Sequence, residues 1–226
     1  MLVLFDIDGT LVAKGTGAHE RAFVLAIDKI YSVDSEKAFY SLKLHGRVDK
    51  EIIVETVGKL GIPESLAKKK VPDCKKLVEG LFPGELKRDF SGQVLPGVRE
   101  ILSKLKKRKV KLGLLSGNFP NVAYGKLKRV GLEKFFSKKL SGLGDSGFSR
   151  VEVACKLARK VVRRTRGEKI VLVGDTPKDI LAGKAIGAVT VAVATGGATK
   201  AELARAKPDF LIRNMWGFRK IIENLI

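Results

Sequence analysis

A short apolar run followed by two acidic residues restricts the fold and chemistry of this chain more than any other stretch. Leu2–Phe5 is continuously apolar, as in a strand that is buried on both faces of a parallel sheet. Asp6 ends the run and Asp8 follows two positions later, so on an extended chain both carboxylates point to the same side. Gly9 then permits a tight turn. The stretch predicts a buried strand that delivers a pair of carboxylates to one end of a sheet.

These two carboxylates need a positive charge close by, because neighbouring carboxylates repel and are costly to bury unpaired. A divalent cation would supply that charge, and oxygen ligands suit Mg²⁺. Thr10 adds a hydroxyl and a backbone amide at the same corner. The alternative is a strand that ends in an ordinary polar turn, with Asp8 and Gly9 as turn residues. Further polar groups later in the chain favour the metal site.

Strand and helix patterns alternate from Val94 onward, which favours an α/β fold with a doubly wound, mostly parallel, Rossmann-like sheet. From residue 18 to about residue 82 there is instead no convincing strand pattern, and apolar residues recur at helical spacing, with an interruption at 44–49. We therefore expect a core domain of residues 1–13 and 93–226, and an inserted all-helical domain of three to five helices at 14–92, punctuated at 61–63 and 83–84. In the core we expect strands at 110–115, 170–173, 189–193 and 210–212, and a short strand that ends near Leu140. We expect helices at 98–105, 122–130, 151–162, 178–186, from 199 onward, and at 216–225. Trp216 is expected to anchor the last helix by packing in the core.

Composition excludes some classes of function. No apolar stretch has the length needed to cross a bilayer, and the acids at positions 6 and 8 interrupt the N-terminal run too early for a signal peptide. Cys74 and Cys155 suggest neither a disulfide framework nor a zinc site, so we expect a reduced, cytoplasmic setting. The net charge is +20, but residues 14–92 hold 15 Lys and Arg against 12 Asp and Glu. The basic excess therefore belongs to the core, where it would favour anionic ligands.

The polar clusters fall where a parallel sheet binds its ligands, at the carboxyl ends of the strands. Ser116-Gly117-Asn118 follows one predicted strand, and Asp175 and Asp179 follow another. Together with Mg²⁺, this set can transfer a phosphoryl group through a covalent aspartyl phosphate. The Ser116 hydroxyl and nearby amides can hold the other phosphate oxygens.

The ordered motifs resemble those of the haloacid dehalogenase superfamily, in the branch of phosphoglycolate-phosphatase-like and phosphomutase-like proteins with a helical cap. The matching segments are residues 5–11, 115–118 and 173–179. The resemblance implies that Asp6 is the nucleophile and Asp8 the general acid and then base. It implies that Asp6, the Asp8 backbone carbonyl and Asp175 hold Mg²⁺ with Asp179 in support, and that Thr10, Ser116, Gly117 and Asn118 bind phosphate.

The superfamily usually has a further motif between the segments at 115–118 and 173–179, called the third motif here. Its lysine neutralises the nucleophile and the phosphate, and this chain departs from that pattern. Lys138 and Lys139 come too early, and Lys156 lies inside a predicted helix. Arg150 stands where that helix begins and would keep the positive charge, so we predict that it takes this catalytic place.

We thus predict a Mg²⁺-dependent phosphatase for a small phosphorylated metabolite, such as a phosphoglycolate-like or sugar phosphate. The first alternative is a hexose phosphomutase, in which His19 takes part. The second is a basic binding module, disfavoured because no nucleic-acid motif is present. Arg47, which follows a glycine inside the helical insertion, could bind a second anionic group of the substrate. We predict no membrane partner.

Overall fold

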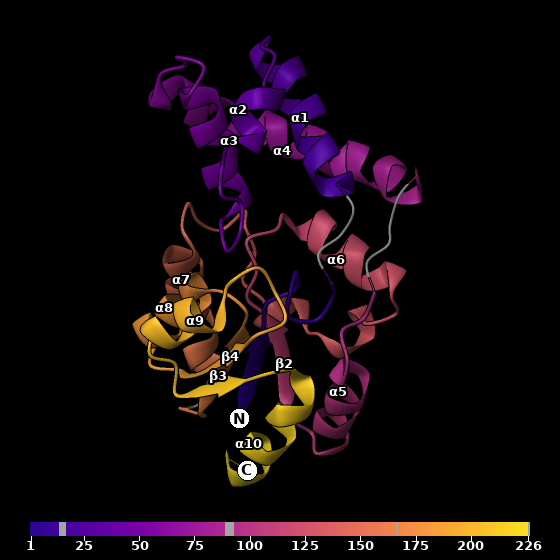
Figure 1. The fold of residues 1–226 in the computed structure, drawn as a ribbon, viewed down its shortest axis with the longest axis vertical. Coiled ribbons are helices and arrows are strands. Elements are labelled where there is room, and N and C mark those ends of the chain that lie inside the picture. Colours follow the sequence, from indigo (N-terminus) through magenta and orange to yellow (C-terminus); the bar gives the residue numbers. More distant parts are fainter. Residues whose placement is uncertain (14–16, 89–92, 166, 226) are drawn as a thin grey trace.

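A five-stranded parallel sheet forms the centre of the computed structural model, which describes residues 1–13, 17–88, 93–165 and 167–225 (Figure 1). Its strand order is β2-β1-β3-β4-β5, with β1 paired to β2 on one side and to β3 on the other. The predicted parallel α/β fold is thereby confirmed. The strands are β1 (Leu2–Phe5), β2 (Lys111–Leu114), β3 (Ile170–Gly174), β4 (Val189–Val193) and β5 (Phe210–Ile212).

The interior strand β1 contributes to two cores, because successive side chains of a strand point to opposite faces. Val3 and Phe5 pack in the cluster that contains residues of α5 (Val98–Lys107) and α10 (Phe218–Leu225). Leu2 and Leu4 pack in the cluster with α7 (Arg150–Thr165) and α8 (Pro177–Ala185). Helices therefore cover both faces of the sheet, and the chain leaves β1 between the carboxyl ends of β2 and β3.

Two local expectations about the core are wrong. Leu140 ends the 3₁₀ turn η2 (Lys138–Leu140) rather than a strand, and the only sheet-like contact nearby among the described residues is the isolated bridge between Leu115 and Gly142. Trp216 is 50% exposed and lies in the 3₁₀ turn η3 (Met215–Gly217). The terminal helix α10 starts two residues later, and its buried side chains are Phe218, Ile221 and Ile222.

The remaining elements of the core are α6 (Pro120–Arg129), η1 (Glu133–Phe135) and α9 (Lys200–Arg205).

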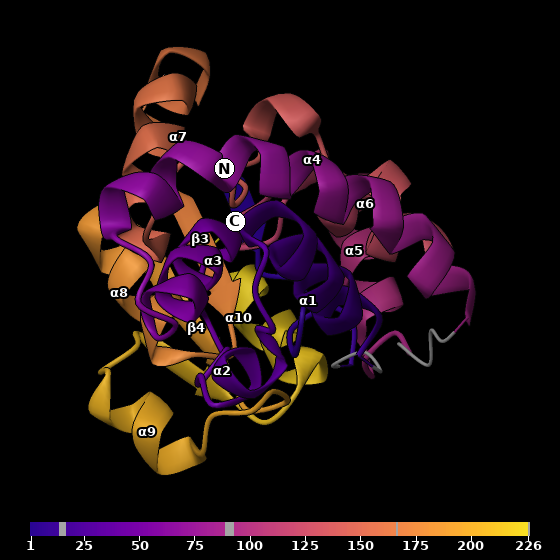
Figure 2. The ribbon, with the colours of Figure 1, turned by 90° about the horizontal axis from the view of Figure 1, so that it is seen from above.

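A helical segment lies above the carboxyl ends of the strands, as Figure 1 shows in indigo to magenta and Figure 2 shows from above. Its own buried apolar cluster includes Phe23, Ile53 and Val78, and Phe119 and Val122 of the core join it. The expected helical spacing is confirmed, but the last helix continues through Pro83, where a break was predicted. The helices of the segment are α1 (Ala18–Tyr31), α2 (Glu36–Tyr40), α3 (Asp49–Gly58) and α4 (Glu64–Arg88).

The predicted domain boundaries at residues 14 and 92 lie outside the described residues, so the division into two domains stays a prediction. Within the part of the chain that is described, no helix combines the length and the apolar character needed to cross a membrane.

Candidate active site

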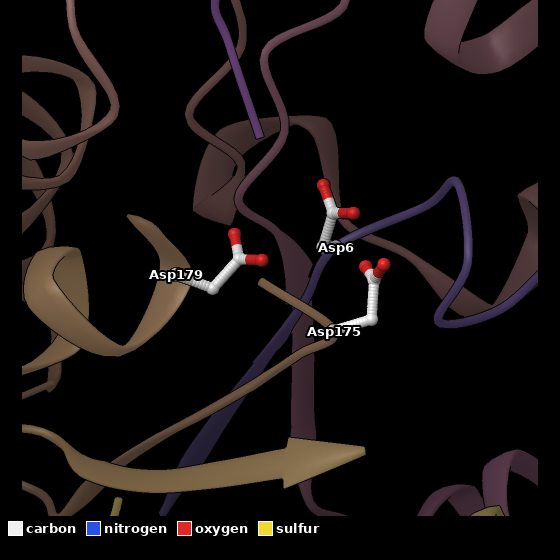
Figure 3. Close-up of side chains that lie close together, drawn as sticks. All are labelled: Asp6, Asp175 and Asp179. Atoms are coloured by element: carbon white, nitrogen blue, oxygen red, sulfur yellow. The ribbon is translucent and has the colours of Figure 1, made fainter. Parts of the chain in front are cut away.

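Three buried carboxylates meet at the carboxyl edge of the sheet. One oxygen from each of Asp6, Asp175 and Asp179 lies within 4.8 Å of the others, and Figure 3 shows the three side chains facing a common space. Asp6 follows β1, Asp175 follows β3, and Asp179 lies in the first turn of α8. They converge because β1 and β3 are adjacent parallel strands that end side by side.

Glycines leave the room that Asp175 occupies. Gly9 has a φ of +82°, and a Cβ atom there would lie 2.4 Å from Asp175 Oδ2; a Cβ atom on Gly196 would lie 1.6 Å from it. The hydroxyl of Thr10 donates a hydrogen bond of 3.1 Å to Asp175 Oδ1. Thr10, predicted to bind phosphate, thus lies where it orients an acidic side chain.

The first turn of α8 holds Asp179 in a capping arrangement. Its Oδ2 accepts hydrogen bonds from the backbone N–H and the hydroxyl of Thr176, at 3.1 and 2.7 Å. Its Oδ1 has no hydrogen-bond partner among the described residues, although it is buried. One oxygen is therefore fixed by the helix terminus, and the other is left for the acidic cluster.

Arg150 is the cation that reaches this cluster. Its Nη1 donates to Asp6 Oδ1 at 2.9 Å and to the Leu115 carbonyl at 3.0 Å, and its Nε lies 3.3 Å from Asp179 Oδ1. The three lysines that the sequence analysis rejected for this place are exposed; they are Lys138, Lys139 and Lys156. Lys156 pairs with Glu152 on its own helix. Arg150 lies beside the nucleophile position, as predicted; its catalytic role stays a prediction.

The charges of this cluster fit a bound divalent cation. Three buried carboxylates face one guanidinium, and burial, opposed by Arg150, raises the pKa of Asp6 to about 7. Burial and the neighbouring carboxylates also raise the pKa of Asp175 well above its usual range. Asp179 Oδ1 accepts no hydrogen bond from the described residues, although Arg150 Nε lies near it, and the donor set is all oxygen, which suits Mg²⁺.

Asp8 lies in a different environment, beside a lysine that the sequence analysis missed. Lys126 of α6 is buried, and its Nζ donates to Asp8 Oδ1 and Oδ2 at 2.9 and 2.7 Å. Burial alone would raise the pKa of Asp8, but the charge and hydrogen bonds of Lys126 hold it below its usual value. The available signal was a lysine four residues after Val122, on the apolar face of its helix.

A cavity of about 300 Å³ connects these groups to the helical segment. Ser116 and Asn118 line its floor, as their predicted contact with phosphate requires. Gly117 instead contacts the helical segment, because a Cβ atom there would lie 1.9 Å from the carbonyl oxygen of Arg47. Its own carbonyl accepts a hydrogen bond of 2.9 Å from the N–H of Asp49.

Both residues predicted to contact substrate from the helical segment line this cavity. The Nδ1 atom of His19 lies 3.4 Å from Lys126 Nζ, and its Nε2 lies 3.3 Å from a carboxylate oxygen of Asp49. The guanidinium of Arg47 pairs with Glu51 and Glu55 on α3. Their roles toward a substrate stay predictions.

The comparison with protein families agrees with this geometry, since the profile of the haloacid dehalogenase-like hydrolases matches residues 1–187. The chain belongs to the haloacid dehalogenase-like hydrolases. The match includes the segments that place Asp6, Arg150 and Asp175, so the acidic cluster lies in the part of the chain that defines this family.

Named relatives and a solved structure resemble the chain over different lengths. A protein of Caldanaerobacter subterraneus subsp. tengcongensis, named "Putative pyrophosphatase PpaX", is 25% identical over 98% of this chain and 94% of its own. A phosphoglycolate phosphatase of Synechococcus elongatus is 31% identical, but over 53% of this chain and 55% of its own. The solved structure titled "putative beta-phosphoglucomutase from Thermotoga maritima" shares the fold, with a TM-score of 0.61, 21% identity, and 100% and 99% of the two chains covered.

Proposed function

We propose that the chain is a Mg²⁺-dependent phosphatase that hydrolyses a small phosphate monoester through an aspartyl phosphate on Asp6. The observation that carries this proposal is the buried cluster of three carboxylates and one guanidinium, of which Asp6, Asp175 and Arg150 line a cavity. Membership of the hydrolase family supports it, as do the phosphatase names of two relatives.

The proposed Mg²⁺ ligands are Asp6, Asp175 and the backbone carbonyl of Asp8, with Asp179 supporting them. When bound, the ion reduces the repulsion between the nucleophile and the phosphate and draws charge from the phosphate oxygens. Arg150 adds a second positive charge beside Asp6, with a donor geometry that suits both a carboxylate and a phosphate oxygen.

The proposed reaction has two steps. An oxygen of Asp6 attacks phosphorus while the bond to the leaving oxygen breaks. The charge of the bound phosphate opposes the effect of Lys126 on the pKa of Asp8, so that Asp8 is protonated in the complex and gives the leaving oxygen its proton. Asp8 then takes a proton from a water molecule that attacks the aspartyl phosphate, which releases phosphate and restores the Asp6 carboxylate. Ser116 and Asn118, at the cavity floor, hold the phosphate oxygens during both steps.

In this proposal the helical segment is a cap that encloses the substrate and sets its size. The cavity is lined by the core and by the segment together, and about 300 Å³ leaves room for a metabolite rather than a polymer. Backbone contacts of Arg47 and Asp49 with Gly117 seat the segment on the phosphate-binding turn.

Metal removal tests the proposal. With Mg²⁺ the protein should hydrolyse 4-nitrophenyl phosphate, EDTA should abolish the activity, and excess Mg²⁺ should restore it. Release of 4-nitrophenolate measures the rate. An activity that EDTA leaves unchanged would refute the metal-dependent mechanism.

A hexose phosphomutase is the second candidate, favoured by His19 lying in the cavity beside the lysine that holds Asp8. Incubation with a sugar 1-phosphate separates the two. Free phosphate supports the phosphatase, whereas a sugar 6-phosphate supports the mutase.

A further inference from the structure

Lys126 places a buried positive charge beside Asp8 in the cavity. Only 6% of the residue is exposed, yet its ammonium group lines the cavity. Its Nζ contacts both oxygens of Asp8, Oδ1 of Asn118 at 3.0 Å and Nδ1 of His19 at 3.4 Å. Burying a lysine is costly unless its charge is paired and its donors are used, and here every named partner lies in the site.

These contacts show which neighbouring atoms accept hydrogen bonds from the Lys126 ammonium group. A lysine has three donors and no acceptor, so Nδ1 of His19 accepts from it. The other ring nitrogen of His19, Nε2, lies 3.3 Å from a carboxylate oxygen of Asp49. Asn118 and His19 thus hold Nζ from two sides, and Nζ holds the Asp8 carboxylate.

The side chain of Asp8 needs such a support. It is 30% exposed toward the cavity, whereas the side chain of Asp6 is 4% exposed and held by Arg150. A partly exposed carboxylate has freedom to rotate, and a misplaced acid loses most of its effect on proton transfer.

We propose that Lys126 is a positioning residue, which fixes the Asp8 carboxylate in the orientation from which it exchanges a proton with the leaving oxygen. The inference rests on the proposed phosphatase function. It assigns Lys126 to the step in which the leaving group departs, and not to the attack by Asp6.

Leaving groups of different basicity test this assignment. Benzyl phosphate releases a strongly basic alkoxide that needs a proton, whereas 4-nitrophenyl phosphate, of similar shape, releases a weak base that does not. The first turnover, measured with enzyme in excess, reports the departure of the leaving group before Asp8 acts again as the base toward water. In that turnover Lys126→Met should slow the release of benzyl alcohol about 100-fold and the release of 4-nitrophenolate less than about threefold, because a positioned acid contributes roughly 10²–10⁴-fold. The enzyme concentration that gives half the maximal single-turnover rate should change little for either ester.

Two further variants control for folding. Lys128→Met removes an exposed lysine from the same helix and should leave both activities unchanged. Lys126→Met leaves Asp8 without its partner, so Asp8→Asn/Lys126→Met, which removes both charges, should fold well and should match Asp8→Asn alone on benzyl phosphate.

The outcomes separate the two proposals. Equal losses in the first turnover of both esters in Lys126→Met, or a further loss in the double variant beyond Asp8→Asn, would overturn the positioning role while the phosphatase stands. A wild-type protein that hydrolyses neither ester with Mg²⁺ would overturn the phosphatase and this inference with it.

Discussion

Asp6 and Asp8 are two residues apart, but their surroundings differ in charge balance. Around Asp6, three buried carboxylates share one guanidinium, and burial raises the pKa of Asp6 to about 7. Around Asp8, one carboxylate meets one ammonium group, and Lys126 lowers its pKa in spite of burial. The carboxylates around Asp6 outnumber the cations there among the described residues, whereas the charge of Asp8 is balanced by Lys126.

This difference separates two tasks that the sequence places side by side. A site in which carboxylates outnumber cations can bind a metal cation together with an anionic phosphate. The surroundings of Asp6 therefore fit the attack on phosphorus. A balanced pair needs no further ion, so the surroundings of Asp8 fit proton exchange with the leaving group. Substitutions near Asp6 and substitutions near Asp8 should therefore slow different steps of the reaction.

The largest effect is expected at the nucleophile. Asp6→Asn keeps the shape of the side chain but removes the attacking oxygen, and should lower kcat for 4-nitrophenyl phosphate at least about 1000-fold. A circular dichroism melt would verify that the variant is folded. Activity near the wild-type level would show that Asp6 is not the nucleophile.

The next effect is expected at Arg150, the guanidinium beside Asp6. Arg150→Ala should lower kcat about 100-fold, and also the melting temperature, because it leaves Asp6 and Asp179 buried without their cation. Lys138→Ala, Lys139→Ala and Lys156→Ala serve as controls and should be near neutral. A large loss of kcat at one of these lysines, with an active Arg150→Ala protein, would move the third motif elsewhere.

The smallest effect is expected away from both acids, on the helical segment. Arg47→Ala should raise KM about threefold for a substrate with a second anionic group, with kcat little changed, because Arg47 lines the cavity but is already paired with Glu51 and Glu55. Lys43→Ala, an exposed neighbour, is the matched control. An unchanged KM for every substrate would exclude a binding role for Arg47.

The sheet and the acidic cluster could be predicted because both follow from local pattern. The apolar run at Leu2–Phe5 can be buried on two faces only in a covered parallel sheet, and adjacent parallel strands bring their carboxyl ends together. Asp6, Asp175 and Asp179 therefore converge, although more than 160 residues separate the first from the others.

The partners of Asp8 could not be predicted, because they depend on how separate elements pack. Lys126 lies in an ordinary helix pattern, and its spacing does not reveal that the helix faces a cavity. Trp216 shows the opposite error: a large aromatic side chain suggested an anchor, but the apolar face of α10 begins at Phe218. Local pattern identifies a buried position but not its neighbours.

Trapping the phosphorylated enzyme tests the central claim most directly, because it distinguishes Asp6 from Asp8. The reaction with 4-nitrophenyl phosphate and Mg²⁺ would be quenched in acid during turnover and digested, and the N-terminal peptide sequenced by mass spectrometry. The account predicts a phosphoryl group on Asp6 in the wild-type protein and none in Asp6→Asn. A phosphoryl group on Asp8 or on another residue would contradict it.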